Sequence, residues 1–203
     1  FAQRSGLETQ PYSVETLEQV TALFAQKAAE YSTQVQRDEN GLFAEDTASI
    51  FEKGPDIYEN VSQEFSCLEL EHPTRAKPIF FSRLQSVLGF TGVYFPFTGE
   101  ANVNVDAPSC LLPATIAHEM AHQRMVAAEQ EANFVGITAS VTSGDPVYVY
   151  SGYLMGLIQL CNALYPVDPE GWQAIVEQYF TPELAADWND NNAYWAELSS
   201  PVE

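Results

Sequence analysis

The chain has 203 residues, of which 46% are hydrophobic, so it is long and apolar enough to bury a sizeable core as one domain. Its 28 acidic and 8 basic residues give a formal net charge of −20, which argues against nucleic-acid binding and against adhesion to anionic lipid. The acidic residues are scattered, so a well-solvated surface explains them better than a funnel for cationic substrates, and we expect a neutral or basic partner.

The N-terminal part of the chain is predicted to be helical. Ser13 is a plausible N-cap for a helix over residues 14–36, whose apolar residues recur at helical spacing. Two shorter helices are expected over residues 47–52 and 56–67. A small sheet should follow, with a strand at residues 78–81 and a hairpin formed by residues 91–97 and 101–106 around a turn-prone Thr-Gly-Glu.

The segment after the hairpin, TIAHEMAHQR at residues 115–124, lies in a predicted helix over residues 112–124 and contains an HExxH motif. On a helix, His118 and His122 lie about 40° apart around the axis and about one turn apart along it, so both imidazoles can reach one ion. Glu119 lies beside them, where it can act on a water molecule at that ion. The motif predicts a zinc site with His118 and His122 as ligands and Glu119 as the catalytic base.

A third protein ligand is expected downstream, in EQEANF at residues 129–134. Catalytic zinc needs three protein ligands and one open position. Glu129 and Asn133 share a helical face, which fits a ligand with a partner that hydrogen-bonds a ligand histidine, whereas Glu131 points roughly opposite to Glu129. We therefore name Glu129 as the third ligand and Asn133 as its supporting residue, with Glu131 and His72 as alternatives.

This assignment requires a sharp turn between about residues 124 and 128. On one unbroken helix Glu129 would lie roughly 10 Å beyond His122 along the axis, too far to share an ion. The sequence there contains no Gly or Pro. Either Met125 or a neighbour takes an uncommon backbone conformation, or the third ligand lies elsewhere.

The strand at residues 101–106 is the predicted substrate-binding edge. Its alternation places Val103 and Val105 toward a core and Asn102 and Asn104 outward. Metalloproteases with such a metal helix bind a peptide as an added strand, so we expect Asn102, Val103 and Asn104 to line that edge. A half-buried edge strand without a ligand is the alternative interpretation.

The C-terminal part is predicted to contain three helices after the ligand helix, at about residues 148–165, 169–180 and 182–198. The first is strongly apolar but reads as a buried helix, since no run of about twenty apolar residues occurs. Cys161 in it is a core residue, while Cys67 and Cys110 would pair only in an oxidising compartment. Five side chains could assist zinc by donating a hydrogen bond to the transition state, although each also has a purely structural explanation. They are Tyr150, Tyr153, Tyr194, Arg83 and Arg124.

These elements predict one α+β domain over residues 1–203, mostly helical with a small mixed sheet whose edge strand precedes the metal helix. It would consist of a helical part at 1–76, the sheet and metal helix at 77–128, and a helical part at 129–203.

The segments SRLQSVLGFTGVYFPFTGEANVNVD, TIAHEMAHQR, EQEANF, YSGYLMGLIQLCNALY and NNAYW together resemble an uncharacterised bacterial membrane-associated family, a domain of unknown function. The resemblance implies a zincin-like fold, a longer protein with N-terminal transmembrane helices, and a position on the extracytoplasmic face of the membrane. The run containing Glu129 and Asn133 also resembles the third-ligand helix of ImmA/IrrE-like metallopeptidases. In the bacterial family a Gly usually follows HQR, where this chain has Met125.

Two functions follow as expectations. The first is a zinc-dependent metallopeptidase, anchored at a membrane, in which Glu119 accepts a proton from water and passes it to the leaving amine of a peptide or protein substrate. The second is a membrane-anchored sensor or binding module on a non-catalytic zincin scaffold. Hydrolysis of a non-peptide amide, such as a cell-wall cross-link, is a third possibility with the same chemistry.

Overall fold

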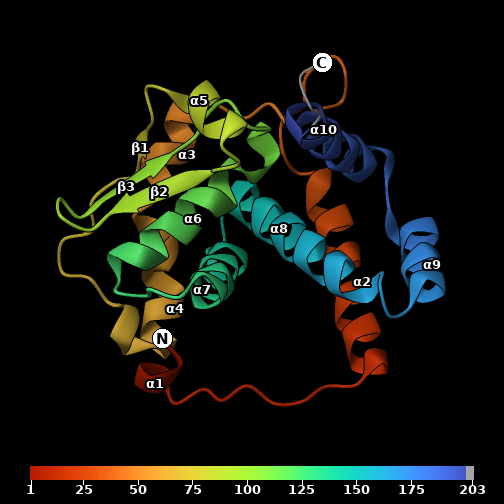
Figure 1. The fold of residues 1–203 in the computed structure, drawn as a ribbon, viewed down its shortest axis with the longest axis horizontal. Coiled ribbons are helices and arrows are strands. Elements are labelled where there is room, and N and C mark those ends of the chain that lie inside the picture. The colour runs from red at the N-terminus through yellow and green to blue at the C-terminus, as the bar shows by residue number, and fades with distance from the viewer. Residues whose placement is uncertain (200–203) are drawn as a thin grey trace.

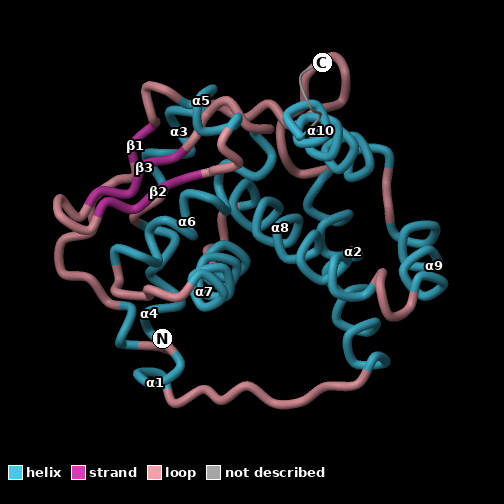
Figure 2. The backbone as a smooth tube through the Cα atoms, viewed as in Figure 1, coloured by secondary structure: helices cyan, strands magenta, loops and turns pink. Residues whose placement is uncertain are grey.

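The computed structural model describes residues 1–199, most of which are helical, with one small mixed sheet. This agrees with the predicted α+β class (Figures 1 and 2). The α-helices are α1 (Ala2–Ser5), α2 (Val14–Ser32), α3 (Thr47–Lys53), α4 (Glu59–Glu64), α5 (Ser82–Val87), α6 (Leu112–Gln123), α7 (Glu129–Thr142), α8 (Pro146–Leu164), α9 (Pro169–Tyr179) and α10 (Pro182–Ser199). The strands are β1 (Lys77–Pro78), β2 (Gly92–Phe95) and β3 (Glu100–Val103).

The helix termini follow from local side-chain chemistry. The Ser13 hydroxyl accepts a hydrogen bond from the Thr16 backbone N–H at 3.1 Å, which confirms the predicted N-cap of α2. Helix α2 ends at Ser32, earlier than predicted, and the chain then reverses through a bridge between Arg37 and Phe43. The single helix predicted over residues 56–67 is wrong, because Phe65 leaves helical dihedrals and splits the segment into short turns around α4.

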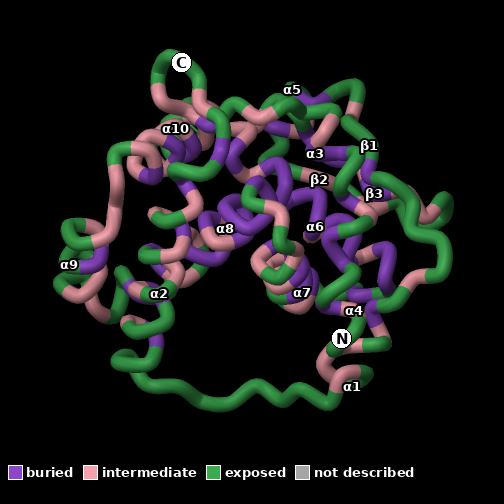
Figure 3. The backbone as a smooth tube through the Cα atoms, turned by 180° about the vertical axis from the view of Figure 1, so that it is seen from behind, coloured by how far each residue is buried: buried purple, intermediate pink, exposed green. Residues whose placement is uncertain are grey.

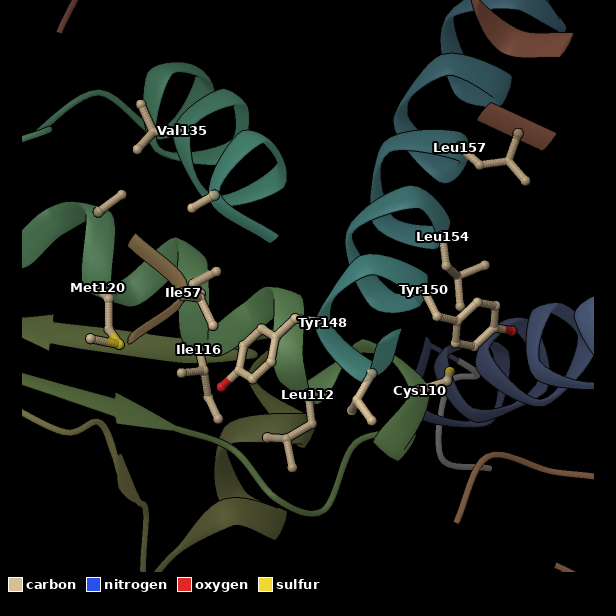
Figure 4. Packing of buried hydrophobic residues seen from close by; sticks show 14 of the residues in the cluster. Ile57, Cys110, Leu112, Ile116, Met120, Val135, Tyr148, Tyr150, Leu154 and Leu157 are labelled. Carbon is tan, nitrogen blue, oxygen red and sulfur yellow. The ribbon is translucent and has the colours of Figure 1, made fainter. Parts of the chain in front are cut away.

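Helix α8 lies at the centre of the core, packed between α2 and α7. Figure 4 shows Tyr148 and Tyr150 on opposite sides of α8, with Leu154 and Leu157 one and two turns further along. All four side chains are fully buried. Figure 3 shows burial concentrated in α6 and α8, whereas the segment linking α1 to α2 is exposed. The expectation of a buried apolar helix is confirmed.

Helix α8 also has the length and composition of a membrane span. Among the residues 1–199 it is the one helix that passes such a test, with a mean hydropathy of 1.2 over its most apolar stretch. However, 61% of that stretch is buried inside the structure. A core helix of a globular domain has the same properties, so the composition of α8 alone does not indicate a membrane span.

The sheet has the order β1-β3-β2, with β3 antiparallel to β2 and parallel to β1. Strand β3 is therefore central, and the prediction that Asn102, Val103 and Asn104 form a substrate-binding edge is wrong. Asn104 lies inside the protein, where its amide donates to the Phe90 carbonyl at 3.0 Å, while Val105 is exposed. The alternation ends at Val103, because the chain leaves the sheet there.

Residues 78–81 do not form the predicted strand. Only Lys77 and Pro78 pair with β3, and the chain then turns into α5, a helix that the sequence did not predict. The serines of α5, Ser82 and Ser86, are buried and hydrogen-bonded, whereas its apolar residues face outward. Helix α5 therefore has the reverse of the usual amphipathic arrangement.

All three cysteines are free thiols, so Cys67 and Cys110 do not form a disulfide here. Cys110 is buried and Cys67 is partly exposed. Burial raises the pKa of the Cys161 thiol to about 11, in keeping with its predicted role as a core residue.

Candidate metal centre

Helix α6 lies between the sheet and α7, with its HExxH residues at the C-terminal half (Figure 1). Buried hydrogen bonds fix its position: the Tyr58 hydroxyl donates to the Ala117 carbonyl at 2.6 Å, and the Ser151 hydroxyl accepts from the Ala114 N–H at 3.0 Å. On the other side, Gly136 of α7 approaches α6 so closely that a Cβ there would lie 2.8 Å from the His118 backbone nitrogen. The backbone that carries the histidines is therefore held from three directions.

The structure brings the three predicted ligands together. The Glu129 carboxylate lies 3.2 Å from His118 Nε2 through one oxygen and 3.6 Å from His122 Nε2 through the other. One donor atom from each of the three residues lies within 4.8 Å of the others. Zinc bonds of about 2.0–2.2 Å would place tetrahedral donors about 3.3–3.6 Å apart, and both histidine–carboxylate distances lie close to that range.

The turn that makes this cluster possible is a Schellman motif at the end of α6. Met125 has a φ of 63°, in the left-handed region. Its N–H donates to the His122 carbonyl at 3.0 Å, and the Val126 N–H reaches back to the Ala121 carbonyl at 3.2 Å. This confirms the prediction that Met125 or a neighbour takes an uncommon conformation, which returns the chain so that Glu129 lies beside the histidines.

Met125 occupies the position where glycine is usual, because a Cβ is disfavoured at positive φ. We expect the Met125→Gly variant to be more stable than Met125→Ala by about 1 kcal/mol, the reverse of their order inside a helix. Chemical denaturation of both variants in the presence of a chelator would measure the difference in free energy of unfolding. Equal stability, or a more stable alanine variant, would contradict the strained turn.

A backbone carbonyl in the same turn orients the second histidine. The Val126 carbonyl lies 2.6 Å from His122 Nδ1, so that nitrogen carries the proton and Nε2 is free to bind a metal. Tyr94 of β2 stacks on the His122 ring, with centroids 6.2 Å apart and an interplanar angle of 24°. The His122 ring is thereby fixed both in tautomer and in orientation.

His118 is held differently. Burial and the neighbouring His122 lower the pKa of His118, which favours the neutral imidazole that a metal requires. Asn133 lies near enough to the ring to act on its pKa in the opposite direction. Nδ1 of His118 nevertheless has no hydrogen-bond partner, so the predicted bond from Asn133 is not formed at that atom.

Glu119 is almost completely buried, with 4% of its surface exposed, and its Oε2 has no hydrogen-bond partner. Burial and the nearby Glu129 carboxylate raise the pKa of Glu119 to about 8. A bound cation would lower that pKa. A Cβ at Gly92 of β2 would lie 2.4 Å from Glu119 Oε1, so the glycine makes room for the carboxylate.

The alternatives for the third ligand lie elsewhere. Glu131 points away from the histidines, and its Oε1 accepts a hydrogen bond from the Ala2 backbone N–H at 3.0 Å. His72 is an exposed loop residue outside the cluster. Of the two glutamates that the sequence left open, only Glu129 joins the histidines.

The cluster opens into a pocket of about 590 Å³. One wall is formed by the segment leading into β2 and by β2 itself, including Phe90, Val93 and Tyr94. Met125 and Glu129 also line the pocket, and 75% of the Glu129 side chain is exposed. The sequence analysis did not identify Gly92 or Tyr94 as site residues. Their position in a hairpin just before the metal helix was the one feature of the sequence that could have indicated them.

None of the five predicted transition-state donors lines this pocket in the part of the chain that the structure describes. The tyrosine hydroxyls or rings have other partners: Tyr150 donates to Asp187, Tyr194 donates to Asp106, and Tyr153 packs on Phe24 and Tyr31. The prediction that these side chains lie at the metal site is therefore wrong. Helical periodicity does not show which face of α8 or α10 points toward the site.

The two arginines also have structural roles. Arg83 pairs with Asp106 on the surface. The Arg124 guanidinium donates to the Met120 carbonyl at 3.0 Å and stacks over the Tyr58 ring at 3.6 Å. Arg124 thus caps the C-terminal end of α6.

Comparisons with known proteins give a family but no function. No curated protein and no solved structure matches the chain. A family model described as "Protein of unknown function (DUF3810)" matches residues 1–203. The match confirms the resemblance to an uncharacterised domain family, and this chain belongs to the DUF3810 family of proteins of unknown function.

Proposed function

We propose that this protein is a zinc-dependent metallopeptidase. The observation that carries the proposal is the convergence of His118 Nε2, His122 Nε2 and the Glu129 carboxylate at donor distances suited to zinc, with the buried Glu119 carboxylate next to them. Two buried polar atoms at the site, His118 Nδ1 and Glu119 Oε2, have no hydrogen-bond partner. Buried polar atoms without a partner are uncommon in proteins, and a bound ion or water is one explanation for them.

The roles follow from the donor set. His118, His122 and Glu129 would hold the ion, and zinc with three protein ligands keeps one open position. When bound, zinc acts as a Lewis acid and allows water to act as a nucleophile at neutral pH. Glu119 would accept a proton from that water and deliver it to the departing amine. The Glu119 carboxylate packs against Gly92, lines the pocket and lies 4.0 Å from His118 Nε2, which would hold it beside that water.

Strand β2 provides the surface on which an extended substrate would lie. It pairs with β3 along one side only, in the described part of the chain, and its residues form a wall of the pocket. A peptide can add to such an edge through backbone hydrogen bonds. This role replaces the one predicted for residues 102–104, and it favours polypeptide over a compact non-peptide amide.

The glycine beside Glu119 gives a prediction about activity. Gly92→Ala would place a methyl group 2.4 Å from the present position of Glu119 Oε1, so the carboxylate must move. We expect hydrolysis to fall about tenfold or more because the base is displaced, while the three ligands still bind metal. Steady-state kinetics and metal content of the variant would check this; Val167→Ala, at an exposed position outside the pocket, is the control. Unchanged kcat in Gly92→Ala would contradict the role of this contact.

The proposal is tested by hydrolysis of an unfolded protein substrate by the purified chain. We expect cleavage that stops with a chelator and returns when zinc is added. On the resemblance of the sequence to a membrane-associated bacterial family, we also propose that the substrates are peptides or proteins at the extracytoplasmic face of a bacterial membrane.

A second candidate function is a sensor or binding module with the same metal site. The observation that favours it is the absence of the predicted tyrosine and arginine donors from the pocket formed by the described residues. Full zinc occupancy without cleavage of any polypeptide would favour this module over the peptidase.

A further inference from the structure

An unusual group of apolar side chains projects into solvent around β2 and α5. Phe80 and Phe81 precede α5, Leu84 and Val87 lie on it, and Phe95 and Phe97 lie at the hairpin; each is more than half exposed. We call these six residues the apolar rim. Figure 1 shows α5 and the hairpin on the side of the molecule opposite to α9.

The exposure of the apolar rim follows from how the fold orients α5 and β2. Helix α5 buries its two serines, Ser82 and Ser86, in hydrogen bonds and turns Leu84 and Val87 outward. In β2 the alternation likewise points Tyr94 toward the metal helix and Phe95 away. Both elements thus present apolar side chains on their outer faces, and such repeated exposure within one stretch of chain, residues 80–97, is typical of an interaction site.

The shape of the apolar rim indicates the kind of partner. Phe80 is 91% exposed and Phe97 is 92% exposed, so both project from loops with little protein around them. A rigid protein partner would need a matching cavity for each ring, whereas a fluid acyl phase takes projecting aromatic rings without one. Projecting rings at both ends of the sheet therefore fit an extended lipid surface better than a flat protein interface.

The charge distribution also favours a lipid partner. Residues 72–99 contain none of the 28 acidic residues and three of the 8 basic ones. Those three, Arg75, Lys77 and Arg83, each pair with a carboxylate from outside the segment, so the region is close to neutral. A chain of net charge −20 repels a second copy of itself and an anionic leaflet, but a neutral apolar surface can still enter a zwitterionic one.

We propose that the apolar rim inserts into the interfacial region of a zwitterionic phospholipid bilayer. Phe90 and Val93 are exposed residues that also line the metal pocket, so the docked protein holds the mouth of that pocket at the membrane surface. This contact is separate from any transmembrane segment. The contact also needs no metal, so it can be tested independently of the proposed peptidase activity.

The test is flotation of the purified chain with vesicles of phosphatidylcholine and phosphatidylethanolamine. We expect the unmodified chain to float with the vesicles, and the Phe80→Ser/Phe97→Ser variant to partition at least about tenfold more weakly, because two fully exposed rings no longer enter the acyl region. The His118→Ala variant should float as well as the unmodified chain, whether or not the protein is an enzyme.

The control is Leu23→Ser/Val167→Ser, which removes two exposed apolar side chains, one from α2 and one from the turn between α8 and α9. We expect the control to float normally, and both double variants to keep the thermal transition of the unmodified chain because the altered side chains are exposed. No flotation of the unmodified chain, or equal loss in both double variants, would overturn the proposal. Sedimentation that shows a dimer abolished by Phe80→Ser/Phe97→Ser, without flotation, would assign the surface to a second copy instead.

Discussion

Replacing Glu119 by Gln is expected to lower hydrolysis by about 10²- to 10⁴-fold while zinc binding stays close to stoichiometric. Glutamine has the size and shape of glutamate, so it fits the space between α6 and Gly92. It cannot accept the proton of the attacking water at any accessible pH. Because Glu119 is outside the cluster of three donors, its loss should leave the ion in place.

The matched control for Glu119→Gln is Glu131→Gln, which makes the same chemical change on the nearby helix α7 at a residue that points away from the pocket. We expect its kcat/KM to equal that of the unmodified chain. The metal content of all three proteins should be measured on the same samples. Hydrolysis by Glu119→Gln within tenfold of the unmodified rate would remove Glu119 from the mechanism.

Replacing Glu129 by Ala is expected to weaken zinc binding by more than about 100-fold, since losing a ligand costs more than the 10- to 100-fold typical of an outer partner. The Glu129 carboxylate is the group that faces both histidine Nε2 atoms. Glu131→Ala should leave the affinity unchanged, because its carboxylate binds the backbone of Ala2. Competition with a chromophoric chelator would give both affinities.

The two variants together separate the alternatives that the sequence left open. Loss of zinc in Glu131→Ala with retention in Glu129→Ala would contradict the arrangement of α7. Both variants change an acidic residue in the first turn of that helix, so any general effect on the helix should be shared. Only the difference between them reports on the metal.

The parts of the fold that sequence predicted best are those fixed by local rules. A serine N-cap, the periodicity of α6 and α8, and the spacing of HExxH depend on neighbours within one or two turns. Even the strained turn could be located, because two ligands on one helix and a third seven residues further on require a sharp turn between them unless the third ligand lies elsewhere. The identity of the strained residue, Met125, then followed from where the helix ended.

The parts that sequence missed depend on distant contacts. The order β1-β3-β2 makes β2 the edge beside the metal helix, and no local pattern distinguishes it from β3. Tyr150 has its hydroxyl on Asp187, which is 37 residues away in the sequence. Helix α5 was missed because it buries serines and exposes leucine and valine, so its pattern contradicts the amphipathic rule on which the prediction relied.

The measurement that tests the central claim most directly is elemental metal analysis of the purified chain beside its His118→Ala variant. The proposed site predicts about one zinc per chain in the unmodified protein and almost none in the variant, because His118 is one of three donors within 4.8 Å of one another. No metal in either protein after zinc has been supplied, or equal metal in both, would contradict a zinc site at His118, His122 and Glu129.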